Sequence, residues 1–374
     1  ILIGLVGSEM CIRDSIYIDD DKIEKSSGKV SGFIREDLSI DTQQHRGSWE
    51  KQINYICDSS HDIDGLILDL ELNDLPNDND ERACFKGTSL AQEIRTRQKG
   101  NDIKSFPIIL FSAHDKLSTL LEATGKDLFD ICIDKESVTT DVFDKFSAQL
   151  YALAKGYRDL QHKANIEDIL NIDEEKLDCI FISELQKLLS SPIHIPASFI
   201  VKELIGKQGL LINESVLAAR VGIDIEKSGD WKKFLDIIKD TKYQGVFCEG
   251  WNRWWKPLLE EWWDSISKEN IRSLTAERRV EIIKSATGLL DLFPADKIEK
   301  CTSDEFWTVC QGYNRPLDPI DGLTLAGQDN LYPWQEPLYV SIDAALKRKN
   351  KILWGEIAEI EKSYFNQLKN RYKH

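Results

Sequence analysis

Polar residues that could hold a metal ion and receive a phosphoryl group directly follow four short apolar runs of the chain. Asp19 and Asp20 follow the run IYI, Asp69 follows GLIL, Ser112 follows IILF, and Lys135 follows ICID. Short apolar runs of this kind are typical of strands that are buried on both faces of a sheet. We therefore expect the five polar side chains to stand at the carboxyl ends of buried strands.

Three aspartates, a serine and a lysine in one pocket favour phosphoryl chemistry. Close carboxylate pairs repel each other by about 4 kcal/mol at an effective dielectric constant near 20. A divalent cation offsets this repulsion, and Mg²⁺ prefers oxygen ligands. A carboxylate can attack phosphorus, while an ammonium and a hydroxyl stabilise the transferring oxygens. Strand-end acidic residues can also be ordinary solvated loop residues; because three occur together, we favour a Mg²⁺-dependent phospho-acceptor site.

The elements that must position these residues form a doubly wound α/β domain over residues 16–155. Apolar runs alternate with segments of helical periodicity, such as Trp49–Cys57 and Val142–Leu153. Five strand–helix units of this length predict a five-stranded parallel sheet covered by helices on both faces. The functional residues of such a sheet collect beyond the carboxyl ends of its strands. The expected strands lie around residues 16–18, 38–40, 65–68, 107–111 and 131–133.

Five sequence fragments in this region resemble the receiver domain of two-component response regulators. The resemblance covers roughly 140 residues, a little over a third of the chain. Each fragment is short, but five in this order and at suitable spacing are fairly specific. The matching fragments are IYIDDD (16–21), GLILDLEL (65–72), FKGTSLAQEIR (85–95), FPIILFSA (106–113) and DICIDK (130–135).

The resemblance implies a role for each residue of the acidic cluster. It makes Asp69 the phosphoacceptor and makes Asp19 and Asp20 the acidic pair that binds Mg²⁺. Asp69 itself and the backbone carbonyl of Glu71 would complete the metal ligands. Because a histidine kinase phosphorylates members of this family, the resemblance also implies such a kinase as a partner.

The resemblance further implies that Ser112 and Lys135 contact the phosphoryl group. Three departures from the family pattern stand near the site. The loop over residues 73–86 is longer and more acidic than usual, Glu136 replaces the common proline after the lysine, and Cys132 replaces an aromatic residue. None of these departures removes a residue that phosphorylation would need.

Residues 156–374 predict a mostly helical domain that would act as an output or partner-binding module for a protein effector. Trp251, Trp254, Trp255 and Trp262 follow helical spacing, and Pro257 would kink that helix or begin its second part. We expect this aromatic stripe to be buried rather than to form a ligand-stacking platform. No GxSxG, P-loop or Rossmann glycine pattern occurs, so the chain is more in keeping with a signalling protein than with an enzyme.

Two further functions stay open as alternatives. The run INESVLAARVGID (212–224) is similar to the first part of a helix-turn-helix, although we favour an ordinary helical hairpin. A DNA-binding transcriptional regulator is therefore one alternative. The other is an effector enzyme or a phosphate-sink component of a defence signalling system.

The charge of the chain argues against nucleic acid and membranes as partners. The 374 residues carry a formal net charge of −16, and no stretch approaches the roughly 18 apolar residues of a membrane span. Residues 1–150 hold 17 basic and 29 acidic residues, a net charge of −12. Residues 151–374 hold 31 basic and 35 acidic residues, a net charge of −4, which gives no sign of a basic binding face.

The cysteines indicate the redox environment of the chain, and its first fifteen residues differ in character from the rest. Eight scattered cysteines without a CxxC pair are typical of reduced thiols, so we expect a cytoplasmic protein. Residues 1–15 resemble a translated sequencing-adapter segment and contain the only methionine, Met10. We expect this leader to carry no function.

Overall fold

A computed structural model of the chain describes residues 13–113, 126–163, 165–349 and 356–372. The chain forms two compact units. The first comprises residues up to Ile172 together with Ser183–Val201 and Gln244–Trp251, and the second comprises the rest.

The first unit is built on a five-stranded parallel sheet with the order β2-β1-β3-β4-β5. This order belongs to the doubly wound α/β folds, in which ligands bind beyond the carboxyl ends of the strands. The unit therefore has the receiver-like fold that the sequence predicts. The strands are β1 (Arg13–Asp19), β2 (Leu38–Gln44), β3 (Gly65–Leu68), β4 (Ile108–Ser112) and β5 (Ile131–Asp134).

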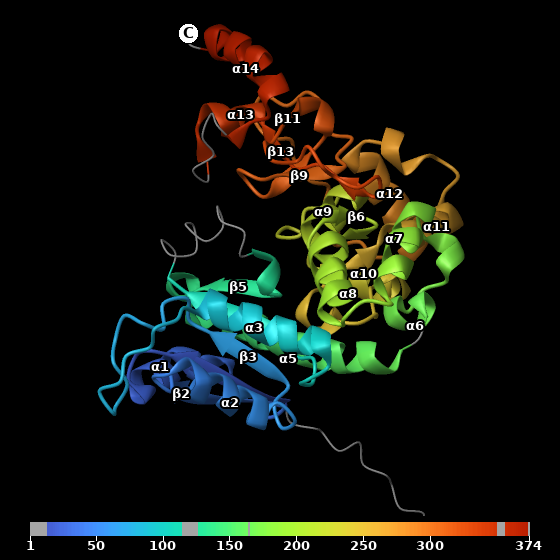
Figure 1. Cartoon of the computed structure of the whole chain (residues 1–374). Coiled ribbons are helices and arrows are strands. Elements are labelled where there is room, and N and C mark those ends of the chain that lie inside the picture. Colours follow the sequence, from blue (N-terminus) through green and yellow to red (C-terminus); the bar gives the residue numbers. More distant parts are fainter. Residues whose placement is uncertain (1–12, 114–125, 164, 350–355, 373–374) are drawn as a thin grey trace, which may run out of the picture. The chain divides into compact units, whose positions relative to one another are not determined.

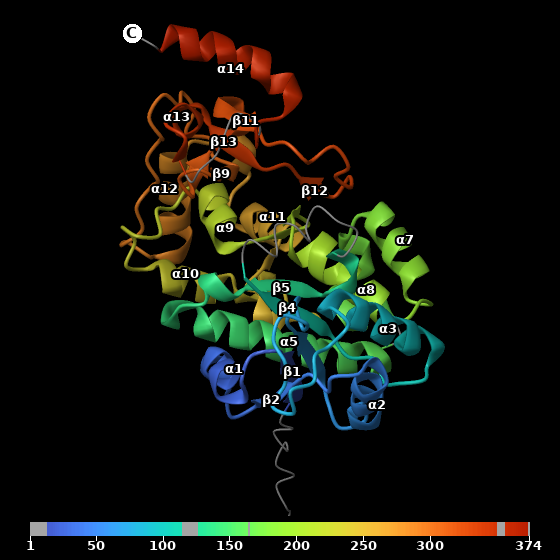
Figure 2. The same cartoon turned by 60° about the vertical axis from the view of Figure 1, so that its left-hand side comes forward.

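Helices cover both faces of this sheet (Figure 2), with α1 and α5 on one face and α2 and α3 on the other. Alternate strand residues point to opposite faces. Ile16, Leu66 and Leu110 therefore pack with α2 and α3, whereas Tyr17 and Phe111 form an edge-to-face pair on the opposite face. The helices are α1 (Ile23–Val30), α2 (Trp49–Ser59), α3 (Gly87–Gly100) and α5 (Phe143–His162).

Strand β1 begins at Arg13, so it takes in the last residues of the expected leader. Ser15 is buried in this strand and pairs with Gly65 of β3. Residues 1–12 lie outside the described residues.

Helix α5 continues beyond the expected domain boundary at residue 155. Two segments from the C-terminal part of the sequence pack against it. One is the short helix α8 (His194–Phe199), and the other contains η8 (Cys248–Gly250). A side chain at Gly156 would lie 2.2 Å from the ring of Phe247, so only glycine fits there. The first unit is thus completed by residues that follow it in the sequence.

The second unit is mainly helical and contains short strands (Figure 1). Its longest sheet has four strands in the order β10-β9-β13-β11. Those strands are β9 (Thr308–Cys310), β10 (Arg315–Leu317), β11 (Gly322–Thr324) and β13 (Tyr339–Ser341). The helices include α9 (Glu214–Val221), α10 (Trp231–Ile237), α11 (Lys256–Ile266), α12 (Ala276–Thr287) and α14 (Glu359–Arg371).

The tryptophan stripe is only partly buried, and it does not form one helix. Trp254 and Trp255 are buried as expected, whereas Trp251 and Trp262 are half-buried. Trp254 and Trp255 form strand β8, which pairs with β7 (Leu211–Ile212). Helix α11 begins only at Lys256, with Pro257 in its first turn. Proline fits this position because the first helical N–H groups have no partner within the helix. The helical spacing upstream of Pro257 was therefore misleading.

The segment that is similar to a helix-turn-helix folds around the buried helix α9. Gly222 ends the helix in the left-handed conformation, at a φ of 76°. Every residue of α9 from Val216 to Val221 is buried. In a helix-turn-helix the second helix reads DNA, and α9 corresponds to the first.

Among the described residues, every helix is too short or too polar to cross a lipid bilayer.

Candidate functional site

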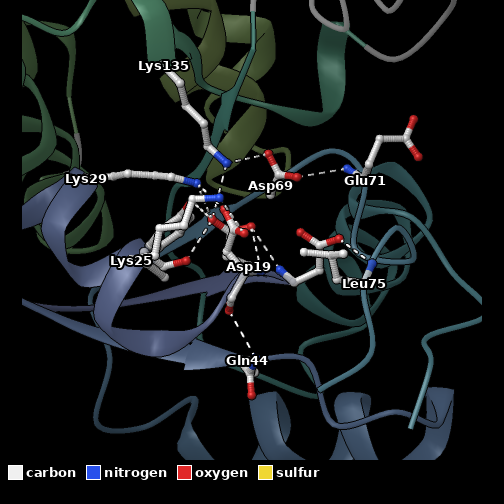
Figure 3. Close-up of polar contacts among 12 residues, drawn as sticks. Asp19, Lys25, Lys29, Gln44, Asp69, Glu71, Leu75 and Lys135 are labelled. Atoms are coloured by element: carbon white, nitrogen blue, oxygen red, sulfur yellow. Dashed lines mark hydrogen bonds and ion pairs between the residues drawn. The ribbon is translucent and has the colours of Figure 1, made fainter. Parts of the chain in front are cut away.

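Three carboxylates meet at the carboxyl end of the parallel sheet (Figure 3). Asp19 ends β1, Asp20 follows it, and Asp69 follows β3. One carboxylate oxygen from each of the three lies within 4.8 Å of the others, and all three residues are buried. They border a cavity of about 350 Å³, which Ser112 and Lys135 also line. Five of the six residues expected at the site therefore line one cavity.

Lys135 neutralises part of this negative charge. Its ammonium lies 2.8 Å from Asp69 Oδ1 and 3.3 Å from Asp19 Oδ2. Lys135 directly follows β5, at the opposite edge of the sheet from β2, and reaches back across the strand ends. The lysine and the central aspartate are thus held in direct contact.

Asp19 is the most heavily bonded carboxylate of the site. Its Oδ2 accepts hydrogen bonds from the Tyr17 hydroxyl and, at 3.0 Å, from Ser26 Oγ. Burial favours the neutral acid, but Lys135, the Tyr17 hydroxyl and Lys29 outweigh it and hold the pKa of Asp19 well below its ordinary value. Asp19 is therefore a permanent anion at neutral pH.

Asp20 has the opposite electrostatic environment. Burial, together with the neighbouring charge of Asp19, raises the pKa of Asp20 to about 6. Its Oδ2 accepts a hydrogen bond of 2.8 Å from the backbone N–H of Leu75. Asp20 therefore has little stabilisation from cations in the protein itself.

Several hydrogen bonds hold the long loop over residues 73–86 beside the acidic cluster. The Asn77 side chain donates to the His45 carbonyl at 3.1 Å, and the N–H of Asp78 donates to Gln44 Oε1 at 3.0 Å. His45 Nε2 lies 3.1 Å from the Leu75 carbonyl. These contacts hold the Leu75 N–H that binds Asp20.

Asp69 is held at the strand end by the backbone around it. The N–H of Glu71 donates to Asp69 Oδ2 at 3.2 Å. A Cβ at Gly87 would lie 2.1 Å from the Asp69 carbonyl oxygen, so only glycine lets α3 begin this close to the site. The Glu71 side chain instead pairs with Lys86 at 2.8 Å (Figure 3 shows it turned away from the cluster).

Ser112 contributes a hydroxyl without a partner. Its side chain is fully buried at the end of β4, and its Oγ has no hydrogen-bond partner among the described residues. A buried hydroxyl without a partner costs free energy unless a ligand or water satisfies it. The hydroxyl stands among the cavity-lining residues, where an oxygen-rich group would meet it.

The chemistry of these groups fits a hard divalent cation and a phosphoryl group. Asp19, Asp20 and Asp69 offer carboxylate oxygens close enough to share one ion, and Mg²⁺ prefers such ligands. Lys135 and the unpartnered hydroxyl of Ser112 offer donors to phosphoryl oxygens.

The structure adds several residues to the site that the sequence patterns do not indicate, among them Ser26, which donates to Asp19. Tyr17 points along its strand to Asp19, Lys29 reaches the cluster from α1, and Leu75 contributes its backbone N–H. Tyr17 stands two residues before Asp19, on the same face of β1, and this spacing could have been noticed. The positions of Lys29 and Leu75 depend on helix and loop packing, for which the sequence holds no local signal.

Comparisons with known proteins give distant likenesses only. No protein-family model matches the chain, and no curated protein matches it. Among solved structures, RcsB from Salmonella enterica serovar Typhimurium is 17% identical with a TM-score of 0.24, covering 50% of this chain and 86% of that chain. The Legionella pneumophila response regulator LqsR is 14% identical with a TM-score of 0.26, covering 62% and 76%.

A third solved structure, an adenylate cyclase from Rhodopirellula baltica, is 13% identical with a TM-score of 0.28, covering 41% of this chain and 99% of that chain. Likenesses with TM-scores this low carry no weight for function. The fold assignment rests on the strand order, and the chemistry rests on the side chains at the strand ends.

Proposed function

We propose that the chain is a response-regulator-like signalling protein that is phosphorylated on Asp69 in a Mg²⁺-dependent manner. One observation carries the proposal. Buried carboxylates of Asp19, Asp20 and Asp69 converge beside a cavity, and Lys135 lies 2.8 Å from Asp69. Buried like charges of this kind raise the free energy of the folded chain, so their convergence is better explained by a ligand than by stability.

In the proposed reaction, a carboxylate oxygen of Asp69 attacks the phosphorus of a phosphohistidine on a histidine kinase. A P–O bond to Asp69 forms as the P–N bond breaks, and the released imidazole nitrogen takes up a proton from solvent. The ammonium of Lys135 and the hydroxyl of Ser112 stabilise the phosphoryl oxygens. A Mg²⁺ ion bound by Asp19, Asp20, Asp69 and the Glu71 carbonyl would neutralise charge on the same oxygens.

The C-terminal part of the chain would read the modified state. The support for this proposal is that the segment Gln244–Trp251 packs against α5 within the first unit. The ring of Phe247 lies against Gly156, and Lys155 forms an ion pair of 2.6 Å with Glu249. This segment lies in the sequence between two stretches of the second unit. A change in the first unit would therefore reach the second through the backbone. The phosphoryl group supplies the local change in charge that biases such an element.

Labelling with a small phosphodonor tests the proposal. The full chain is incubated with acetyl phosphate and MgCl₂, and intact mass is measured for the wild type and for Asp69→Asn. We expect a gain of one phosphoryl group in the wild type, its absence in the variant, and its loss when EDTA replaces MgCl₂. Equal labelling of both proteins, or no labelling of either by acetyl phosphate or a kinase phosphodonor, would overturn the phosphoacceptor role of Asp69.

A further inference from the structure

We propose that Lys29 acts as a tethered cation of the acidic site and sets its affinity for a divalent cation. This inference rests on the proposed function, because it concerns the same carboxylates. Lys29 would be a positioning residue: it acts on the metal ligands rather than on the reacting phosphoryl group. Its charge would compete with the metal ion for Asp19.

Lys29 reaches the cluster from α1, as Figure 3 shows. Its ammonium lies 2.6 Å from Asp21 Oδ2 and 3.5 Å from Asp19 Oδ2. The Asp19 side chain is only 1% exposed, and that of Lys29 is 27% exposed. A lysine ammonium this close to a nearly inaccessible carboxylate is screened far less than a surface ion pair.

The direction of helical side chains explains why Lys29 reaches back to the strand end. Long side chains in a helix lean toward the helix N-terminus, and α1 begins directly after the acidic run. Lys29, in the last turn of α1, therefore extends back along the helix to Asp21 and Asp19. Its apolar stem lies along the helix while its charge enters the site.

The charges of the site explain what this lysine does. The carboxylates of Asp19, Asp20, Asp21, Asp69 and Asp74 line the cavity, together with the ammonium groups of Lys29 and Lys135. Carboxylates therefore outnumber ammonium groups around the cavity, and this excess of negative charge attracts a divalent cation. Without Lys29 the excess would grow by one charge, and the site would attract the cation more strongly.

Asp19 shows the competition most directly. Its Oδ2 is within hydrogen-bond distance of the Tyr17 hydroxyl, Ser26 Oγ and the ammonium groups of Lys29 and Lys135. An oxygen surrounded by these donors is poorly available to a metal ion. Lys29 is the longest of these contacts, at 3.5 Å, and is the ammonium that does not touch Asp69.

Calorimetric titration of the full chain with MgCl₂ tests the proposal. We expect Lys29→Met to bind Mg²⁺ about tenfold more tightly than the wild type, because one competing positive charge is removed. Lys25→Met is the matched control: Lys25 lies on the same helix and pairs with Asp21 at 2.8 Å, but it is 67% exposed. Its affinity should stay within about twofold of the wild type.

A second variant tests whether the change in Mg²⁺ affinity comes from the lost charge or from the altered side chain. Lys29→Arg keeps the positive charge, so its Mg²⁺ affinity should stay near that of the wild type. Unchanged or weaker binding by Lys29→Met, or an equal gain in Lys25→Met, would overturn the role of Lys29 while leaving the metal site intact. If neither the wild type nor any lysine variant binds Mg²⁺, the metal site of the proposed function fails as well.

If Lys29→Met unfolds too readily for calorimetry, thermal melts give the same comparison. The rise in melting temperature on adding MgCl₂ should then be larger in Lys29→Gln than in the wild type. An equal or smaller rise contradicts the proposal.

Discussion

Both units bury charged side chains, but they satisfy them in different ways. In the first unit, Asp19, Asp20 and Asp69 border a cavity, and Lys29 and Lys135 neutralise only part of their charge. In the second, Arg279 is fully buried, and its Nη1 donates to the backbone carbonyls of Arg220, at 3.0 Å, and Phe306, at 2.6 Å. One cluster faces a space that a ligand can enter, and the other ties the main chain together.

A functional site and a structural network of buried charges differ in what surrounds the charged groups. Burial together with the nearby charge of Arg272 lowers the pKa of Arg279 to about 10, so even a strongly perturbed group can be structural. What marks the acidic cluster is the combination of converging like charges with a bordering cavity. An unpartnered buried atom alone does not mark a site: Ser112 Oγ has no partner among the described residues, but neither do Nε and Nη2 of Arg279. Four substitutions test this distinction, beginning with the largest expected effect.

Arg279→Met should lower the free energy of unfolding by about 3–5 kcal/mol. The substitution leaves buried carbonyls of α9 and of Phe306 without their donor. Urea unfolding followed by tryptophan fluorescence measures the effect, because most tryptophans of the chain lie in the second unit. Asp69 phosphorylation by acetyl phosphate should be retained under native conditions. A loss below about 1 kcal/mol would mean that Arg279 is not structural.

Ser112→Ala should slow phosphorylation by about tenfold to a hundredfold, because a donor to the phosphoryl oxygens is removed. The same change should leave the urea midpoint unchanged or slightly higher, since the hydroxyl has no protein partner to lose among the described residues. Ser147→Ala is a matched control: its buried hydroxyl donates to the Phe33 carbonyl at 2.6 Å. Ser147→Ala should have a lower urea midpoint and an unchanged phosphorylation rate. Slower phosphorylation in Ser147→Ala, or a lower urea midpoint in Ser112→Ala, would contradict the distinction between the site and the structural hydroxyl.

Asp20→Asn should stabilise the metal-free protein by about 1 kcal/mol. It removes one of the converging negative charges, while the amide oxygen can still accept from the Leu75 N–H. The variant should also lose the rise in melting temperature that MgCl₂ produces in the wild type. Thermal melts with and without MgCl₂ measure both effects. A less stable variant that still responds to MgCl₂ would place Asp20 among the structural charges.

His194 should give the smallest effect, a dependence of stability on pH. Burial, together with the positive charges of Arg95 and Lys99 and opposed by Asp130, lowers the pKa of His194 to about 4. In the unfolded chain His194 takes up a proton near pH 6.5, whereas in the folded chain it does so only near pH 4. The folded state therefore keeps its full stability above pH 6.5 and loses free energy of unfolding as the pH falls from 6.5 toward 4. His194→Gln should therefore lose less of its melting temperature between pH 7 and pH 5 than the wild type. Equal losses would mean that His194 is not kept neutral by folding.

The first unit could be predicted well because its signals are local. Each buried strand is a run of apolar residues, and each functional side chain follows such a run, so GLIL already places Asp69 at a strand end. The parallel arrangement then brings the strand ends together. The second unit could not be predicted as well: Trp254 and Trp255 have helical spacing but pair as a strand with Leu211 and Ile212. Pairing between distant residues overrides local periodicity.

Runs of consecutive residues are enough to predict the parallel sheet and the residue types at its carboxyl edge, because burial and strand periodicity are local properties of the chain. Which other groups join these residues depends on how helices and loops pack around the strand ends. Lys29 and the N–H of Leu75 reach Asp19 and Asp20 through the packing of α1 and of the loop over residues 73–86. Residues 244–251 join α5 in the same way, nearly a hundred positions along the chain. Such contacts depend on distances in space, which local sequence patterns do not encode.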